Sequence, residues 1–422
     1  MSFGKEVLAI REEIIETTQK LIQINTVETQ AQPNAPFGQG NREALNYVLD
    51  LGKQWGFTTK DLDGYAGYLE FGEGDDVVVV IPHLDVVPEG TDWDYPPFGG
   101  EIHNGNIYGR GASDNKGPGV ASLYAFKLVR DSGLPIKKRV RLVFGTDEES
   151  GFECVKHYIK VEGLPTTGFT PDGAFPVINA EKGIISGNFV LQIPEGVTAL
   201  TFTGGTARNV VPASAKATVA GTTYEATGVA AHASTPEAGE NAIIKLAKEL
   251  QQIASHPVLD FLKIASSPET LGIAMEDEIS GHLTYNLGLI NVDKKVATLT
   301  INIRYPVTKN GIEIIQQLKN IAKAHGATFE DETNSLPHYI SEDSPLVQTL
   351  LGAYTAVTGL TGKPLAMGGG TYARALGNFV AFGGRFPGAP KNAHQKNEFI
   401  SIDTLLKDTE IYATGIYELA KE

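Results

Sequence analysis

The chain has 422 residues, with 35 Lys and Arg against 50 Asp and Glu, so its formal net charge is −15. This acidic balance opposes the phosphate neutralisation that nucleic-acid binding requires, and we expect no nucleic-acid partner. Hydrophobic residues make up 41% and charged residues 20%, a globular composition that argues against wholesale disorder, and the absence of a run of about 18 apolar residues argues against membrane insertion.

The N-terminal segment is the first predicted helix. Apolar residues recur at helical spacing from Val7 to Ile22, which favours an amphipathic helix. Lys, Arg and Glu are interspersed among them, and the long uncharged run of a signal peptide is missing, so we expect this helix to belong to the fold. A second helical pattern covers 41–55.

Two predicted strands are each followed directly by polar side chains. The run VVVVI at 77–81 is typical of a central strand buried on both faces, and His83 and Asp85 come next. After a helical pattern over 116–132, the strand predicted at 139–144 runs directly into the acidic turn TDEES. In sheets built from alternating strands and helices, ligands gather beyond the carboxyl ends of the strands. We therefore expect a site at this edge.

Near residue 186 the pattern changes to short alternating strands with two helices, predicted over 241–253 and 311–324. In the strand predicted at 297–305, apolar side chains occupy one face, and Arg304 projects from the other.

The last part of the chain resembles the first again, with a helical pattern and an apolar strand. We therefore predict an α/β fold in which residues 1–185 and 339–422 form one domain with a mostly parallel sheet. Residues 186–338 would form an inserted α+β domain.

Scattered polar residues must carry any chemistry, because HExxH, GxSxG, Walker and paired CxxC patterns are absent. Imidazoles and carboxylates form a ligand set suited to Zn²⁺, with Mn²⁺ or Co²⁺ as alternatives. Taken singly, each candidate also fits an ordinary structural or surface role. The candidates lie at strand ends or in glycine-rich turns: His83, Asp85, Asp114, Glu148, Glu149, Asp172 and His394.

The number of carboxylates favours two cations over one. If Asp114, Glu149 and Asp172 are ligands, their buried negative charges repel strongly unless two divalent cations and a hydroxide balance them. Of the two adjacent glutamates, Glu148 and Glu149, one can bind metal while the other faces the activated water as general base. Asp85 is placed to orient the imidazole two residues before it.

The ordered motifs HLDVVPEG, GRGASDNKG, GTDEESG, PDG and NAHQKNE resemble those of the co-catalytic zinc metallopeptidases of the M20 family. GTDEESGFECVKHYIK and GGGTYAR are most similar to the PepV-type dipeptidase branch. The resemblance covers nearly the whole chain. It implies a zinc-exopeptidase catalytic domain with an inserted lid. The implied activity is hydrolysis of the peptide bond of dipeptides or short peptides.

The resemblance also implies a role for each candidate. His83, Asp114 and Asp172 would hold one zinc ion, and Asp114, Glu149 and His394 the other, so that Asp114 bridges the pair. The peptide bond after Asp114 would be cis. Glu148 would be the general base and Asp85 a catalytic neighbour.

In the lid, the resemblance implies that Asn209, His232 and Arg304 bind substrate or stabilise the transition state. An imidazole such as His232 can stabilise the charge of a tetrahedral intermediate, and a guanidinium fits a terminal carboxylate. The amides around Gly370 and Thr371 could assist as an anion nest. Lid closure would bring these groups onto the substrate.

Several alternatives stay open at this point. The same metal centre could serve an N-acyl-amino-acid amidohydrolase, and a non-enzymatic binding protein would be expected to lack a ligand or the base. The partner would be a small peptide, with no membrane and no nucleic acid, and the chain could act as a monomer or a homodimer. A single cysteine, Cys154, cannot form an intramolecular disulfide, which favours a cytoplasmic location.

Overall fold

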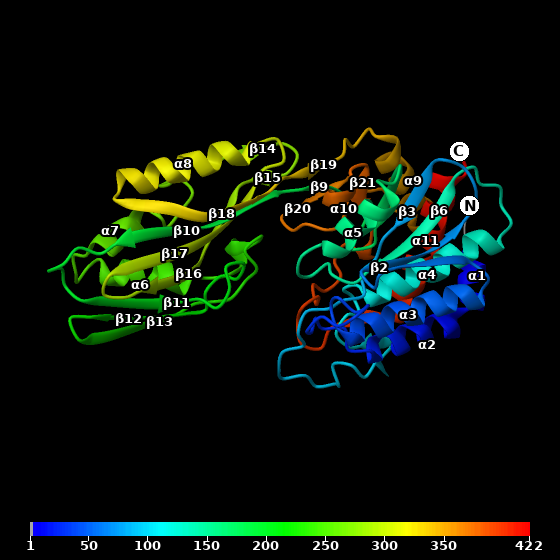
Figure 1. The fold of residues 1–422 in the computed structure, drawn as a ribbon, viewed down its shortest axis with the longest axis horizontal. Coiled ribbons are helices and arrows are strands. Elements are labelled where there is room, and N and C mark those ends of the chain that lie inside the picture. The colour runs from blue at the N-terminus through cyan, green and yellow to red at the C-terminus, as the bar shows by residue number, and fades with distance from the viewer. Residues whose placement is uncertain (1–2) are drawn as a thin grey trace. The chain divides into compact units, whose positions relative to one another are not determined.

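The computed structural model describes residues 3–422, and the chain divides into two compact units. The first unit extends to Asn179 and resumes at Ile340–Leu365 and Thr371–Glu422. The second unit comprises Ala180–Tyr339, green and yellow in Figure 1, together with the short segment Ala366–Gly370. The predicted fold class is confirmed: the first unit is α/β, and the second is α+β.

A mixed sheet, most of whose strands belong to the first unit, forms the centre of that unit. Its strand order is β1-β2-β6-β3-β7-β21-β9-β19, and β20 pairs with β9. The pairs β6–β3, β3–β7 and β7–β21 are parallel, whereas β1–β2, β2–β6, β21–β9 and β9–β19 are antiparallel. The bounds are Thr58–Leu62 (β1), Ala66–Phe71 (β2), Val77–Val80 (β3), Arg139–Gly145 (β6), Thr167–Thr170 (β7), Ile178–Glu181 (β9), His338–Tyr339 (β19), Leu365–Met367 (β20) and Phe379–Ala381 (β21).

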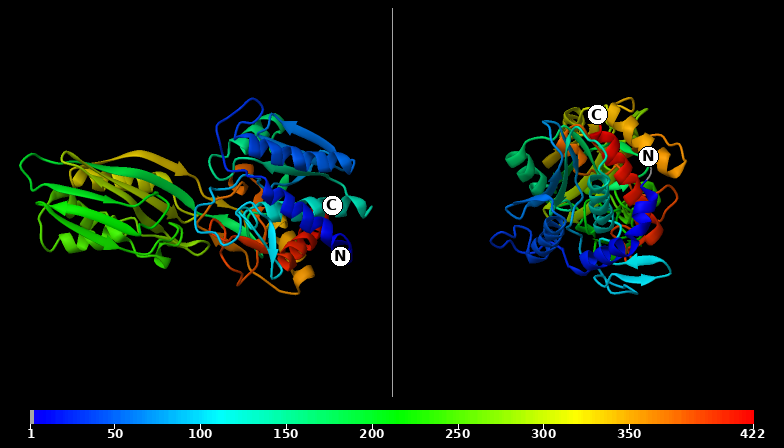
Figure 2. Two further views of the ribbon diagram at one scale, coloured as in Figure 1. Left: turned by 90° about the horizontal axis from the view of Figure 1, so that it is seen from below. Right: turned by 90° about the vertical axis from the view of Figure 1, so that its right-hand side faces the viewer.

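Helices cover this sheet, and their apolar faces supply much of its core. The predicted first helix is divided in two at Ile10. The C-terminal helix α11 packs against α4 and α9 (Figure 2). The bounds are Gly4–Ala9 (α1), Arg11–Gln23 (α2), Gln39–Gln54 (α3), Lys116–Asp131 (α4), Glu153–Glu162 (α5), Pro345–Thr358 (α9), Ala373–Leu376 (α10) and Ile402–Ala420 (α11).

Two small sheets complete the first unit. The three-stranded sheet has the order β23-β5-β4, and the two-stranded sheet pairs β22 with β8. The bounds are Glu101–His103 (β4), Asn106–Tyr108 (β5), Gly173–Ala174 (β8), Gly384–Arg385 (β22) and Phe399–Ser401 (β23).

The second unit is built on a seven-stranded sheet with the order β13-β12-β11-β16-β17-β10-β18. All six of its strand pairs are antiparallel. The bounds are Gly183–Gln192 (β10), Leu200–Gly204 (β11), Ser214–Val219 (β12), Thr222–Thr227 (β13), Thr284–Val292 (β16), Val296–Tyr305 (β17) and Ala327–Ser335 (β18).

Helices of the second unit pack on this sheet, and both helices predicted there are present. They are α6 (Ala242–Leu250) and α8 (Gly311–Ala324), and α7 (Pro257–Ile264) adds a third. A short hairpin, β14 (Glu276–Asp277) with β15 (Gly281–His282), and a 3₁₀ turn, η1 (Pro236–Ala238), complete the unit. The apolar face predicted for β17 lies in the core, where Leu299, Ile301 and Ile303 are fully buried.

The direction of the central strands positions the site. Because β3, β6 and β7 are parallel neighbours, their carboxyl ends meet at one edge of the sheet. His83 follows β3, Glu148 follows β6, and Asp172 follows β7. Within residues 3–422, no helix is both long and apolar enough to cross a membrane.

Candidate active site

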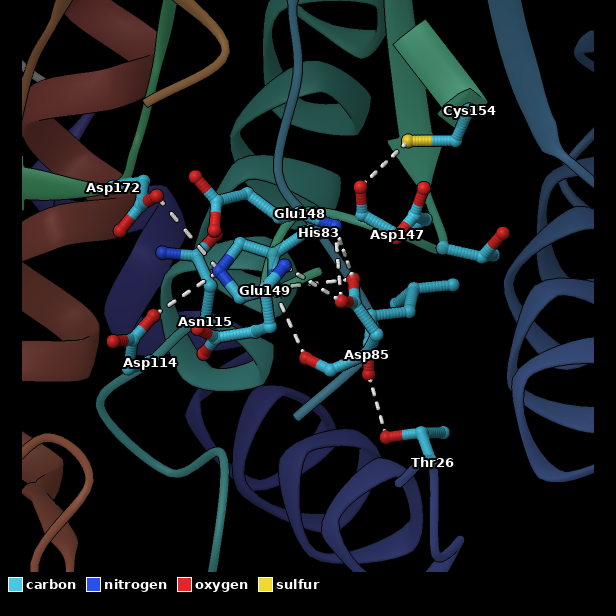
Figure 3. A network of polar contacts seen from close by, with 12 residues as sticks. Thr26, His83, Asp85, Asp114, Asn115, Asp147, Glu148, Glu149, Cys154 and Asp172 are labelled. Atoms are coloured by element: carbon cyan, nitrogen blue, oxygen red, sulfur yellow. Dashed lines mark hydrogen bonds and ion pairs between the residues drawn. The ribbon is translucent and has the colours of Figure 1, made fainter. Parts of the chain in front are cut away.

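Three loops that follow parallel strands lie together at the edge of the sheet (Figure 3). Backbone hydrogen bonds join two of them: the amide of Leu84 donates to the carbonyl of Gly145 at 2.9 Å, and the amide of Gly145 donates to that of Pro82 at 3.0 Å. His83, between these contacts, is fully buried. Its Nε2 lies 3.8 Å from the carboxylate of Asp172.

The carboxylate of Asp114 lies between two imidazoles. Its Oδ1 is 3.1 Å from Nε2 of His83, and its Oδ2 is 3.1 Å from Nε2 of His394. The peptide bond from Asp114 to Asn115 is cis, and Asn115 donates from its side chain to the carbonyl of Pro171 at 2.7 Å. Each oxygen of one carboxylate thus faces a different imidazole, which is the arrangement of a bridging ligand.

The remaining acids complete two overlapping groups of possible metal ligands. His83, Asp114 and Glu149 form one group, and His83, Glu148 and Asp172 form the other; within each, the ligand atoms lie within 4.8 Å of one another. Nε2 of His394 lies 2.9 Å from Oε1 of Glu149. The structure therefore brings all five predicted ligands and Glu148 to one place.

His394 and Glu148 differ from an ordinary surface histidine and an ordinary surface acid. His394 has a φ of 63°, a left-handed conformation that is uncommon outside glycine and clusters at functional sites. The side chain of Glu148 is predicted as a base, yet its carboxylate lies in one of the two ligand groups.

Asp85 makes contacts that its predicted role did not include. Nδ1 of His83 lies 3.0 Å from the main-chain oxygen of Asp85 and 3.5 Å from the carboxylate. The carboxylate accepts hydrogen bonds from the backbone amides of Glu148, at 2.9 and 3.0 Å, and of Glu149, at 3.0 Å. Asp85 thus orients the imidazole mainly through its backbone and fixes the acidic turn through its side chain.

The charges of the cluster shift the pKa of both imidazoles upward. Burial alone would lower the pKa of His394, but hydrogen bonds to Asp114 and Glu149 outweigh it and raise the pKa to about 11. At His83, burial is likewise outweighed by Asp114 and Asp85, and the pKa is raised well above its usual value. The two imidazoles thus attract protons because carboxylates surround them.

The pKa values of the glutamates are also raised. Burial is the main cause at Glu148, and the charge of Asp172 adds to it. Burial and the charge of Asp114 raise the pKa of Glu149. A cluster that stabilises positive charge and disfavours further negative charge fits divalent cations among its carboxylate and imidazole donors.

The acidic turn is stabilised from behind by Asp147. Its carboxylate accepts from the amides of Gly151 at 2.9 Å and Glu153 at 2.8 Å, and from the hydroxyl of Ser150. Cys154, next in the chain, is fully buried, and burial raises the pKa of its thiol to about 12. Cys154 is therefore a core residue and not a nucleophile.

The second unit brings two of the predicted substrate residues together. Val210 and His232 pair in an antiparallel bridge, and the amide of Ala233 donates to the carbonyl of Asn209 at 2.8 Å. Nδ1 of His232 lies 2.7 Å from the hydroxyl oxygen of Ser234. The segments that carry Asn209 and His232 are thus fixed to each other.

Arg304 belongs to the same region of the second unit. Its Nε donates to Oδ1 of Asn302 at 2.9 Å, and its Nη1 donates to the carbonyl of Gly368 at 2.9 Å. A Cβ atom added at Gly368 would lie 2.7 Å from Cβ of Ser234, so the glycine allows close packing there. The division between the units falls between Gly370 and Thr371.

Sequence reasoning missed two residues beside the cluster, Arg110 and Glu398. Both are buried and form an ion pair of 2.6 Å. Oε1 of Glu398 also accepts from the backbone amide of Asp114 at 3.0 Å. Their position in the sequence could have indicated them, because both lie in motifs that carry proposed ligands: Arg110 lies in GRGASDNKG, and Glu398 is the last residue of NAHQKNE.

Comparisons with known proteins agree with one another. The model of peptidase family M20/M25/M40 matches residues 79–418. A relative from Bacillus subtilis strain 168, which carries the provisional name dipeptidase YtjP, is 42% identical over 466 aligned residues, with 100% of both chains covered.

Two solved structures share the fold at low sequence identity. Human carnosine dipeptidase 1 has a TM-score of 0.64 and 14% identity, with 99% of this chain and 98% of that chain covered. The YXEP protein of Bacillus subtilis, described as a dinuclear metal-binding peptidase, has a TM-score of 0.58 and 12% identity, with 98% and 99% covered.

Proposed function

The chain belongs to peptidase family M20/M25/M40, and from this premise we propose that it hydrolyses the peptide bond of dipeptides or other short peptides at the cluster around Asp114. The observation that carries the proposal is the placement of the two Asp114 oxygens, each 3.1 Å from a different imidazole. The provisional name of the relative from Bacillus subtilis supports the substrate class.

The donor set fits two divalent cations. We assign His83, Asp114 and Asp172 to one and Asp114, Glu149 and His394 to the other. Zn²⁺ is the first candidate, and Mn²⁺ and Co²⁺ are alternatives. When bound there, the cations would supply Lewis acidity, to polarise the scissile carbonyl and to lower the pKa of the attacking water toward neutral pH.

The chain's own groups then move the proton and hold the acidic turn. Glu148 would accept the proton of the attacking water and deliver it to the leaving amine. Burial and the charge of Asp172 raise the pKa of Glu148. Asp85 accepts hydrogen bonds from the backbone amides of Glu148 and Glu149. Glu148 lies in the ligand group of Asp172, and Glu149 in that of Asp114.

In the second unit, Arg304 would bind the terminal carboxylate of the peptide. His232 would stabilise the oxyanion, and Asn209 would contact the substrate. Gly370 and Thr371 would add backbone donors. These assignments rest on the matching motifs and on the shared neighbourhood of Asn209, His232 and Arg304 described above. We also infer a reducing, cytoplasmic compartment from the single buried cysteine.

A substrate panel on the metal-reconstituted protein tests the proposal. We expect hydrolysis of Ala-Ala, no hydrolysis of N-acetyl-Ala, and loss of activity after chelation that added Zn²⁺ or Mn²⁺ reverses. Preference for N-acetyl-Ala would replace the dipeptidase by an amidohydrolase. No cleavage of either substrate at full metal loading would refute both. Gel filtration of the same sample decides between monomer and homodimer.

A further inference from the structure

A buried ion pair lies beside the proposed metal centre. Arg110 is 2% exposed and Glu398 is 0% exposed, and Nη1 of Arg110 donates to Oε2 of Glu398 at 2.6 Å. Buried charges must be paired, so the contact by itself fits a structural role. The second carboxylate oxygen of Glu398 distinguishes this pair from an ordinary one.

That oxygen binds the backbone that carries Asp114. Oε1 of Glu398 accepts from the amide of Ser113 at 2.9 Å and from the amide of Asp114 at 3.0 Å. The hydroxyl of Ser113 donates to it as well, at 3.2 Å. Two adjacent amides aimed at one oxygen restrict how the peptide can rotate, and thus the direction in which the side chain of Asp114 leaves the backbone.

Arg110 extends the same contact to the segment that carries His394. Its Nη1 also donates to the carbonyl of Gln395, the residue after His394, at 3.2 Å. Its Nη2 donates to the carbonyl of Glu89 at 3.2 Å. One ion pair thus connects the loops of Asp114 and His394, which are far apart in the sequence and adjacent in the cluster.

We propose that Glu398, supported by Arg110, is a positioning residue that aims the carboxylate of Asp114 between His83 and His394. The inference rests on the proposed function, because it assumes that Asp114 bridges two cations. A bridging carboxylate must present its two oxygens to different ions at once, so a small rotation weakens both contacts. Groups behind metal ligands commonly change metal affinity or activity about 10–100-fold when removed.

The test compares Glu398→Gln with a matched control elsewhere in the first unit. Arg141 donates to Oε2 of Glu70 from Nε at 2.8 Å and from Nη2 at 2.6 Å. Within residues 3–422, neither side chain forms a hydrogen bond or ion pair with the proposed metal ligands. Glu70→Gln therefore also removes one carboxylate from an arginine, although Glu70 is more exposed than Glu398 and Arg141 keeps Glu162 at 3.1 Å. Zn²⁺ alone is the probe: its affinity is measured by chelator competition, beside kcat and KM for Ala-Ala and the melting temperature.

Glutamine keeps one neutral oxygen, a weaker acceptor for the amides of Ser113 and Asp114, and its NH2 group cannot accept from Arg110. For Glu398→Gln we therefore expect the Zn²⁺ affinity of the weaker site and kcat each to fall about 10–100-fold, with KM nearly unchanged and metal occupancy restored by excess Zn²⁺. Glu70→Gln should lower only the melting temperature. If Glu398→Gln fails to fold, Arg110→Lys replaces it; this variant keeps the charge but loses the planar fork, and we expect the same changes at smaller size.

Two results would overturn the inference. The first leaves the proposed metal centre intact, and the second refutes it as well. If wild type binds two Zn²⁺ and the folded variant binds them equally tightly, Glu398 has no positioning role, while the metal centre stands. If wild type binds no Zn²⁺, Mn²⁺ or Co²⁺, the metal centre and the inference fail together.

Discussion

Both carboxylate oxygens of Asp85 accept a hydrogen bond from the backbone amide of Glu148, Oδ1 at 3.0 Å and Oδ2 at 2.9 Å. Only 3% of Asp85 is exposed, so these bonds are shielded from water. The base proposed for the reaction is thus fixed at its backbone by a residue from the loop of His83. This contact links the position of a metal ligand to the position of the general base.

Asp85→Asn should lower kcat about 10–100-fold, because the amide of asparagine offers one acceptor where the carboxylate offers two. The metal ligands remain, so we expect two Zn²⁺ per chain and little change in KM. Steady-state kinetics with Ala-Ala and elemental analysis measure both quantities. A kcat within about twofold of wild type would show that the acidic turn keeps its position without Asp85.

Glu148→Ala should abolish turnover and leave the metal content intact. General-base catalysis contributes about 10²–10⁴-fold, and we expect at least such a loss in kcat. Because the carboxylate of Glu148 lies in a group with His83 and Asp172, the alternative role of Glu148 is that of a metal ligand, and it predicts a different result. If Glu148 were a ligand, the variant would lose bound Zn²⁺ in elemental analysis.

His394→Ala should reduce bound Zn²⁺ toward one equivalent per chain. It removes the imidazole that lies 2.9 Å from Glu149 and 3.1 Å from Asp114, while the group around His83 and Asp172 remains. His157→Ala is the control, since this histidine contacts Asp63 at 2.9 Å and belongs to neither ligand group. Unchanged stoichiometry in His394→Ala would contradict the assignment.

Arg304→Lys should raise KM for Ala-Ala about tenfold or more, because lysine cannot reproduce a planar two-point contact with a carboxylate. For the C-terminal amide of the same dipeptide, wild type and variant should be nearly equal, since that substrate has no carboxylate to bind. Initial rates with both substrates give the comparison. An equal loss for acid and amide would assign Arg304 to the structure of the second unit.

Much of the fold was predictable because its signals are local. Three of the four valines in β3 are buried as expected, and α8 begins and ends where the sequence placed it. The helices α5, α7 and α11 were not predicted. In α11, polar residues such as Asp408, Thr409 and Glu410 are buried among the apolar ones, so tertiary packing determines burial there and the amphipathic pattern is weak.

In the site, too, some residues could be selected from the local sequence, whereas other contacts depend on parts of the chain that are distant in sequence. Residue type and position after a predicted strand were enough to select His83 and Glu148, because parallel strands place such residues at one edge. No strand was predicted before Asp172, which was selected from its PDG turn. The carboxylate of Asp85 and the contacts of Glu398 depend on backbone amides, which every residue carries. A sequence pattern contains no record of which amide a buried carboxylate will reach, so only the structure could provide these contacts.

Asp408 gives a prediction about stability that does not involve the metal centre. It is buried in α11, and neither of its carboxylate oxygens has a hydrogen-bond partner within residues 3–422. Burial raises its pKa well above the usual value for Asp. The folded state therefore binds one more proton than the unfolded state between the unfolded and the folded pKa.

The sign of the effect follows from that extra proton. As the pH rises above the unfolded pKa, Asp408 lowers the free energy of unfolding, by about 1.4 kcal/mol per pH unit until the folded pKa is reached. Asp408→Asn removes this contribution, so its stability relative to wild type should increase from pH 5 to pH 8. Urea unfolding at both pH values measures the difference, with the exposed Asp403→Asn on the same helix as control. A difference between Asp408→Asn and wild type that stays constant with pH would mean that Asp408 ionises in the folded protein as readily as in the unfolded chain.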